Sequence, residues 1–218
     1  MKNRVIYMKE FYKEVRNMPY YRNYQASSGA VHNISKHEDA VEAVLLRHGA
    51  VRARVGKKVS KSARNDLIDG NVESIGLQPG EYMAQPCGPN NSPDFIVFDG
   101  EEHHFIECKS SKQAKPTFNS GMPNSAYVYI FCSEKTNETT LFRGNDVVTD
   151  EQIAVVVEFR RSQKAQEDQL NKKLLEIDVN NRGFQWYTRP MYVQAGKSEH
   201  TSYFKHKDKS ACEERIIS

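Results

Sequence analysis

The sequence predicts an α/β fold in which a mixed β-sheet of four or five strands carries helices on its faces. Three observations lead to this prediction. A helical capping and spacing pattern covers residues 35–48, a β-hairpin pattern covers 95–109, and a run of apolar, strand-forming residues covers 126–132. Helices and strands that alternate in this way normally pack as layers around one hydrophobic core.

The length of 218 residues fits a single domain, 1–218, with a core over about 35–133 and peripheral arms at 1–30 and 196–218. The chain has 38% hydrophobic and 27% charged residues, and its net charge of +3 excludes a uniformly basic surface. We expect no secretory signal and no membrane span, because no apolar run approaches the ~18 residues that a span requires. Four widely spaced cysteines without a CxxC pair argue against a zinc site or a disulfide framework, so we expect a cytoplasmic protein.

The helix at 35–48 is predicted from its start signal and its apolar spacing. Ser35 is the expected N-cap and Glu38 the acidic partner of a capping box, and Gly49 is the expected stop. Val41 and Leu45 lie on the apolar face, and Glu38 flanks that face near the start of the helix.

The hairpin brings acidic and basic side chains to one end of the predicted sheet. Its first strand (95–98) begins directly after Asp94, and its second strand ends at Glu107 and Lys109. Alternate residues of a strand point to the same face, so Glu107 and Lys109 project together, and closure of the hairpin brings Asp94 near them. Two carboxylates beside an ammonium suit Mg²⁺, which takes oxygen ligands and lowers the pKa of a bound water.

The residues Pro93-Asp94, twelve intervening residues and then Glu107-Cys108-Lys109 resemble the signature of the PD-(D/E)xK nucleases, whose best-known members are type II restriction endonucleases. This resemblance implies that Asp94 and Glu107 hold Mg²⁺, with the Cys108 carbonyl as a further ligand. It also implies that Lys109 orients the attacking water or stabilises the developing charge.

The resemblance extends over about residues 35–133 and includes the helix before the hairpin. In many PD-(D/E)xK nucleases a glutamate of that helix reaches the metal. Glu38 is the first candidate for this role, with Glu42 one turn later as the alternative. A purely capping role for Glu38 stays open.

The family implies a restriction endonuclease-like core and a type II restriction endonuclease. Such an enzyme recognises a short sequence in double-stranded DNA, hydrolyses both strands with Mg²⁺ and leaves 5′-phosphate and 3′-hydroxyl ends. One catalytic cluster per chain and two strands to cut indicate a homodimer, and a cognate DNA methyltransferase is expected in the same system. The alternatives are a structure-specific repair or junction-resolving nuclease, and a DNA-binding module with a degenerate nuclease site.

Two polar segments are candidates for contact with DNA. Residues 51–64 contain six basic residues and no acid, and the loop 111–124 follows the catalytic strand with ammonium and amide groups that suit phosphates and base edges. For both segments, ordinary solvated surface is the alternative. The selected DNA-binding candidates are Arg52, Arg54, Lys57, Lys58, Lys61, Lys112, Gln113, Lys115 and Asn119.

The remaining segments give weaker functional signals. Residues 1–24 mix tyrosines with basic residues, which favours an amphipathic segment packed on the domain or on a second subunit over a grip on nucleic acid. A long helix is predicted from Thr149 or Asp150 to about Ile177, with a polar middle that is exposed, bent or at a dimer contact. Phe184 to Gln194 predict a strand or hairpin interrupted by a proline.

Overall fold

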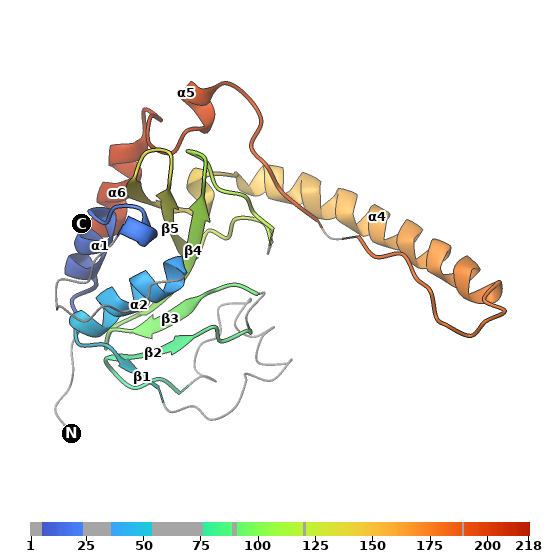
Figure 1. Cartoon of the computed structure of the whole chain (residues 1–218), viewed down its shortest axis with the longest axis horizontal. Coiled ribbons are helices and arrows are strands. Elements are labelled where there is room, and N and C mark those ends of the chain that lie inside the picture. Colours follow the sequence, from blue (N-terminus) through green and yellow to red (C-terminus); the bar gives the residue numbers. More distant parts are fainter. Residues whose placement is uncertain (1–5, 24–35, 54–75, 89–90, 120, 189) are drawn as a thin grey trace.

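A six-stranded mixed sheet forms the centre of the protein, and its strand order follows the chain order (Figure 1). The strands are β1 (Val51–Arg52), β2 (Glu81–Ala84), β3 (Phe95–Phe98), β4 (His103–Ser111), β5 (Tyr127–Ser133) and β6 (Glu138–Arg143). The pairs β1–β2 and β4–β5 are parallel, and the other neighbouring pairs are antiparallel. The α/β class is therefore confirmed, with six strands in place of the four or five expected.

The structure is a computed structural model, and it describes residues 6–23, 36–53, 76–88, 91–119, 121–188 and 190–218. Within these ranges no helix combines the length and the apolar character that crossing a membrane requires. Most of the basic segment 51–64, together with Ser35, lies outside the described residues.

The β3–β4 hairpin forms as the sequence predicts. Phe95 pairs with Ile106, so the two strands run in register up to the residue that follows Asp94. Gly100 in the turn has a φ of 113°, which residues with a Cβ atom rarely adopt. Beyond the start of β3, residues 107–111 of β4 continue in register with β5. The end of β4 that carries Glu107 and Lys109 thus extends past its hairpin partner.

Helix α2 (His37–Arg47) begins one residue later than predicted. Lys36 is its N-cap, and the backbone N–H of Lys36 donates to Asp39 Oδ2 at 3.2 Å. The capping box expected from Ser35 and Glu38 is therefore wrong, because this start places Asp39, and not Glu38, at the third helical position. Glu38 does not have the acidic role in the cap.

The buried face of α2 fixes the helix over the sheet. Val41, Val44 and Leu45 have no exposed surface, as the helical spacing predicts. His37 is also buried, and its Nε2–H donates to the Ile130 carbonyl of β5 at 3.2 Å. Burial lowers the pKa of His37 to about 4, so its ring is neutral at pH 7. The first turn of α2 is thereby held against the sheet.

Helices α1 (Met8–Arg16) and α6 (Lys209–Ile217) join α2 in the same hydrophobic cluster, which covers one face of the sheet (Figure 1). Phe11 of α1 is fully buried there, and burial of such a side chain contributes about 2–3 kcal/mol. Both helices therefore belong to the core, and not to the peripheral arms that we expected at 1–30 and 196–218. Of the two interpretations of residues 1–24, an amphipathic segment packed on the domain is confirmed for α1.

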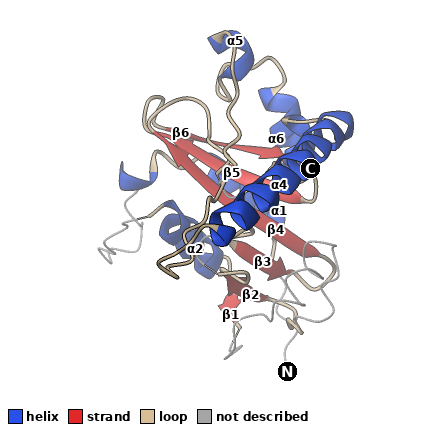
Figure 2. Cartoon of the chain, turned by 90° about the vertical axis from the view of Figure 1, so that its right-hand side faces the viewer, coloured by secondary structure: helices blue, strands red, loops and turns tan. Residues whose placement is uncertain are grey.

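After β6 a long helix leaves the sheet (Figures 1 and 2). This helix, α4 (Asp150–Glu176), has 27 residues, none of them buried. Its N-cap is Thr149, one of the two predicted caps, whose Oγ1 accepts the Gln152 N–H at 3.3 Å. The chain then returns beside the helix, where Asn171 exchanges two hydrogen bonds with the backbone of Trp186, at 2.7 and 2.9 Å.

The strand or hairpin predicted within 184–194 is absent from the described part of this segment. In a strand, the backbone N–H and C=O of Trp186 would pair with a neighbouring strand. Here both groups form hydrogen bonds with the side chain of Asn171 on α4. Tyr192 forms a single antiparallel bridge with Phe118.

Candidate active site

The adjoining ends of β3 and β4 place three predicted catalytic side chains together. The Asp94 N–H donates to the Ile106 carbonyl at 3.0 Å, and Asp94 Oδ2 accepts the Cys108 N–H at 2.7 Å. Lys109 Nζ donates to Glu107 Oε1 at 2.7 Å. Glu107 and Lys109 project from the same face of β4 because they are two residues apart on a strand.

The two carboxylates interact because Asp94 is half-buried and Glu107 is buried. Glu107 is only 4% exposed. Burial, reinforced by the negative charge of Glu107, raises the pKa of Asp94 to about 7, although the Cys108 N–H and Lys109 favour the ionised form. Further positive charge beside the pair would therefore favour the ionised form of Asp94.

Glu38 adds to this negative field and Glu42 does not. Glu38 is half-buried in the first turn of α2, and its charge contributes to the raised pKa values of Asp94 and Cys108. Glu42 is occupied elsewhere, since it accepts the Tyr82 O–H at 2.6 Å. The structure thus favours Glu38 over Glu42 as the helix residue that belongs with the cluster.

The donor set of this cluster fits a hard divalent cation. Asp94 and Glu107 offer carboxylate oxygens, which Mg²⁺ prefers, and their mutual repulsion falls when a cation lies between them. In a strand the N–H and C=O of one residue point to the same side, so the Cys108 carbonyl points towards the side on which its N–H meets Asp94. These three residues would hold the metal.

The predicted DNA-binding residues are only partly within the described chain. Arg52 on β1 is exposed and lies 3.6 Å from a carboxylate oxygen of Glu42. Arg54, Lys57, Lys58 and Lys61 lie outside the described residues. In the loop after β4, three candidates are exposed to solvent, namely Lys112, Gln113 and Asn119.

Lys115 has a structural contact that the sequence did not indicate. Its Nζ donates to the Gln194 carbonyl at 2.8 Å, and the nearby Phe118 forms the bridge with Tyr192. The loop after β4 is therefore fastened to the segment that returns from α4. Lys115 is a weaker candidate for DNA contact than Lys112, which is exposed.

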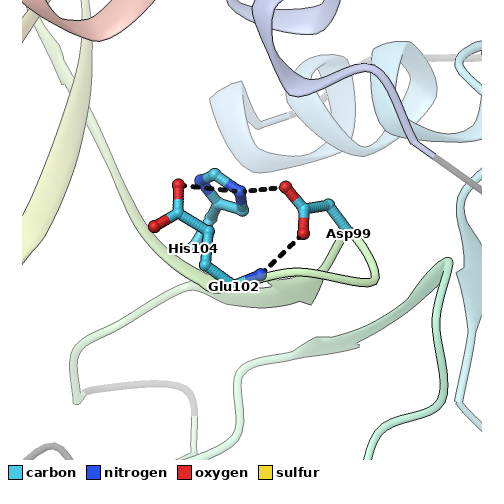
Figure 3. A group of neighbouring side chains, drawn as sticks. All are labelled: Asp99, Glu102 and His104. Atoms are coloured by element: carbon cyan, nitrogen blue, oxygen red, sulfur yellow. Dashed lines mark hydrogen bonds and ion pairs between the residues drawn. The ribbon is translucent and has the colours of Figure 1, made fainter.

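A second group of carboxylates, with a histidine, lies at the opposite end of the hairpin (Figure 3). Ligand atoms of Asp99, Glu102 and His104 lie within 4.8 Å of one another, and this is the one such group of three found in the described residues. Sequence reasoning missed it, although a turn aspartate followed five residues later by a histidine is a usable signal.

Hydrogen bonds within the turn account for this second group. Asp99 Oδ1 accepts the N–H groups of Glu101 and Glu102, each at 2.8 Å, and Asp99 Oδ2 pairs with His104 Nε2 at 2.8 Å. Burial acts to raise the pKa of Asp99, but these donors outweigh it and the pKa is lowered. We interpret the group as a lock on the turn. It borders a cavity of about 660 Å³ that Asp94 and Glu107 do not line.

Comparisons of the chain with models of protein families, with curated proteins and with solved structures found no match. The functional argument therefore rests on the residues of this chain and on their geometry.

Proposed function

We propose that the protein is a Mg²⁺-dependent, site-specific deoxyribonuclease of the type II restriction endonuclease class. The observation that carries the proposal is the meeting of Asp94, Glu107 and Lys109 at the hairpin end. The position of Glu38 on the helix before the hairpin adds support, because the PD-(D/E)xK resemblance implies an acidic residue there. The expected reaction is hydrolysis of both DNA strands at a short sequence, with 5′-phosphate and 3′-hydroxyl ends.

The chain supplies positioning and charge to this reaction. Asp94 and Glu107, with the Cys108 carbonyl, would hold Mg²⁺, which lowers the pKa of water and offsets phosphate charge. Lys109, anchored by Glu107 at 2.7 Å, orients the attacking water and stabilises negative charge on the phosphate. Glu38 keeps the local potential negative and so favours retention of the cation.

Digestion of plasmid DNA with Mg²⁺ tests this proposal. We expect discrete fragments from the wild-type protein and none from Asp94→Asn or Lys109→Ala. Glu38→Gln should slow cleavage by about 10- to 100-fold, equivalent to ~1.4–2.8 kcal/mol of lost stabilisation. Glu42→Gln is the matched control on the same helix, and it should retain near-normal activity because Glu42 is held by Tyr82.

The outcomes separate the proposed function from its alternatives. An intact plasmid together with cleavage of branched DNA would indicate a structure-specific nuclease. Specific binding without cleavage of any DNA would indicate a binding module. Fragments from Asp94→Asn would refute the site assignment itself.

A direct binding measurement complements the digest. Mg²⁺ should raise the thermal unfolding midpoint of the wild-type protein at pH 8, because a ligand that binds only the folded state stabilises it. Asp94→Asn should lose this shift, since it lacks one anionic ligand. An equal shift in both proteins would place the cation elsewhere.

A further inference from the structure

Residues 150–193, which comprise α4 and the segment that returns beside it, form a projection from the sheet (Figures 1 and 2). Of the 15 large hydrophobic side chains found exposed in the described residues, 12 lie on this projection. Soluble proteins rarely leave so much apolar surface in water unless it meets a partner. The projection is therefore the strongest candidate for a contact surface.

One face of α4 is already covered by the returning segment. Asn171 bonds twice to the backbone of Trp186, and Glu167 accepts the Thr188 N–H at 3.1 Å. Glu167 and Asn171 are four residues apart and so lie on one side of the helix. This side is satisfied within the chain and leaves the rest of the helix for a partner.

A second face of α4 carries an uncovered stripe. Its members recur every three or four residues, so they align along one side of the helix. Four of them are apolar and 42–72% exposed: Val155, Phe159, Leu170 and the C-cap Ile177. The complete stripe consists of Val155, Phe159, Ser162, Gln166, Leu170, Lys173 and Ile177.

The stripe is symmetric about Gln166. From this residue its members follow at intervals of four, three and four residues in both directions, ending at Val155 and Ile177. A helix with such symmetry matches a second copy of itself that runs antiparallel, which is the condition for an isologous two-fold interface. We propose that two copies of the chain dimerise through α4, with the two-fold axis beside Gln166.

The pairing is complementary at three of its four levels, and at the fourth Ser162 faces Leu170 of the second copy. Val155 faces Ile177 of the second copy, which buries an apolar pair at each end of the interface. Phe159 faces Lys173 of the second copy, where an ammonium over an aromatic face is attractive. The two Gln166 amides meet at the axis, and a polar pair at the centre of a helix interface fixes its register.

The uncovered face of α4 is long enough for a helix-to-helix contact between two copies. A helix of 27 residues is about 40 Å long and about 10 Å wide with its side chains. Its uncovered face therefore offers on the order of 400 Å² per copy in projection, at the low end of the sizes of protein interfaces. The proposal stands on this geometry alone. If the proposed function also holds, the same two-fold axis relates the two catalytic clusters that cleave the two DNA strands.

Sedimentation without DNA or Mg²⁺ tests the proposal with a matched pair of variants. We expect the wild-type protein to be a dimer. Val155→Lys should raise the dissociation constant of this dimer by about 100-fold, because a two-fold interface contains the substituted residue twice. Val157→Lys is the control. Val157 is the same residue type, is 42% exposed and lies on the opposite side of α4, so this variant should remain dimeric. Circular dichroism checks that both variants fold.

Disulfide trapping tests the position of the axis. Gln166→Cys in a Cys212→Ser background should give a covalent dimer on oxidation, since the two positions meet at the axis. Lys164→Cys is the control at nearly the same height on the opposite side of the helix, and it should stay monomeric on a denaturing gel. The native Cys87, Cys108 and Cys132 are buried.

A monomeric wild-type protein would overturn the proposal. So would a dimer that neither responds to Val155→Lys nor traps through position 166. These results are independent of the plasmid digest, so a dimer without nuclease activity would refute only the proposed function. A monomer that cleaves DNA would refute only the dimer.

Discussion

Replacement of Asp94 by asparagine should stabilise the metal-free protein at alkaline pH. Asparagine has the shape of aspartate and can still accept the Cys108 N–H, but it carries no charge. The wild-type carboxyl has its pKa raised from 3.8 to about 7 by burial and by Glu107. The folded state thus holds the Asp94 proton more tightly than the unfolded state does.

The sign and size of the effect follow from proton linkage. Below about pH 4 the carboxyl is protonated in both states, and its full contribution to stability is present. As the pH rises towards 7 the unfolded state ionises first, so the wild-type protein loses about 1.4 kcal/mol per pH unit. Between pH 5 and pH 8 this loss amounts to about 3 kcal/mol at most.

Urea unfolding followed by circular dichroism, with EDTA present, measures this effect. Asp94→Asn should gain stability over the wild type on going from pH 5 to pH 8. Asp99→Asn is the control. Hydrogen bonds lower the pKa of Asp99, so its contribution is lost only as the pH falls below about 4, and its stability difference from the wild type should not change between pH 5 and pH 8. If the difference in the free energy of unfolding between Asp94→Asn and the wild type did not change with pH, the raised pKa of Asp94 would be refuted.

Three further substitutions test the core. Phe11→Ala should cost about 3–5 kcal/mol in urea unfolding, because Phe11 is fully buried, and a loss below about 1 kcal/mol would place α1 outside the core. Gly144→Ala should cost about 1–3 kcal/mol, since the new Cβ would meet the backbone carbonyl of Asn124; unchanged stability would show that this contact relaxes. Thr140→Val should cost about 1–3 kcal/mol by removing the hydroxyl that donates to buried Glu213 at 2.6 Å, and a neutral result would mean that another donor replaces it.

The β3–β4 hairpin was predictable because its signals are local. An Asp-Gly turn and two apolar runs specify the register, and the register alone brings Asp94 towards Glu107 and Lys109. The start of α2 was misjudged by one residue because Ser35 and Glu38 match the capping pattern, whereas Lys36 and Asp39, which the structure places at the N-cap and the third helical position, do not. Only the packed structure shows that Asp39, and not Glu38, bonds to the backbone.

Features that depend on distant segments were not predictable in this way. The fastening of Lys115 by Gln194 joins residues 79 positions apart, and no spacing rule connects them. The strand prediction at 184–194 failed for the same reason, since side chains of α4 provide the partners of Trp186. The sequence left open whether the polar middle of α4 is exposed, bent or at a dimer contact. The structure shows that no residue of α4 is buried, and that several of its apolar side chains are exposed as well.

The agreement between strand order and chain order has a consequence for synthesis. Each strand pairs with the strand made just before it, so the sheet can grow by successive addition as the chain leaves the ribosome. Helix α1 is the exception, because besides α2 it packs against β6 and α6, which lie more than 120 residues after it in the chain. A nascent chain stalled before α6 therefore leaves part of the apolar side of α1 exposed.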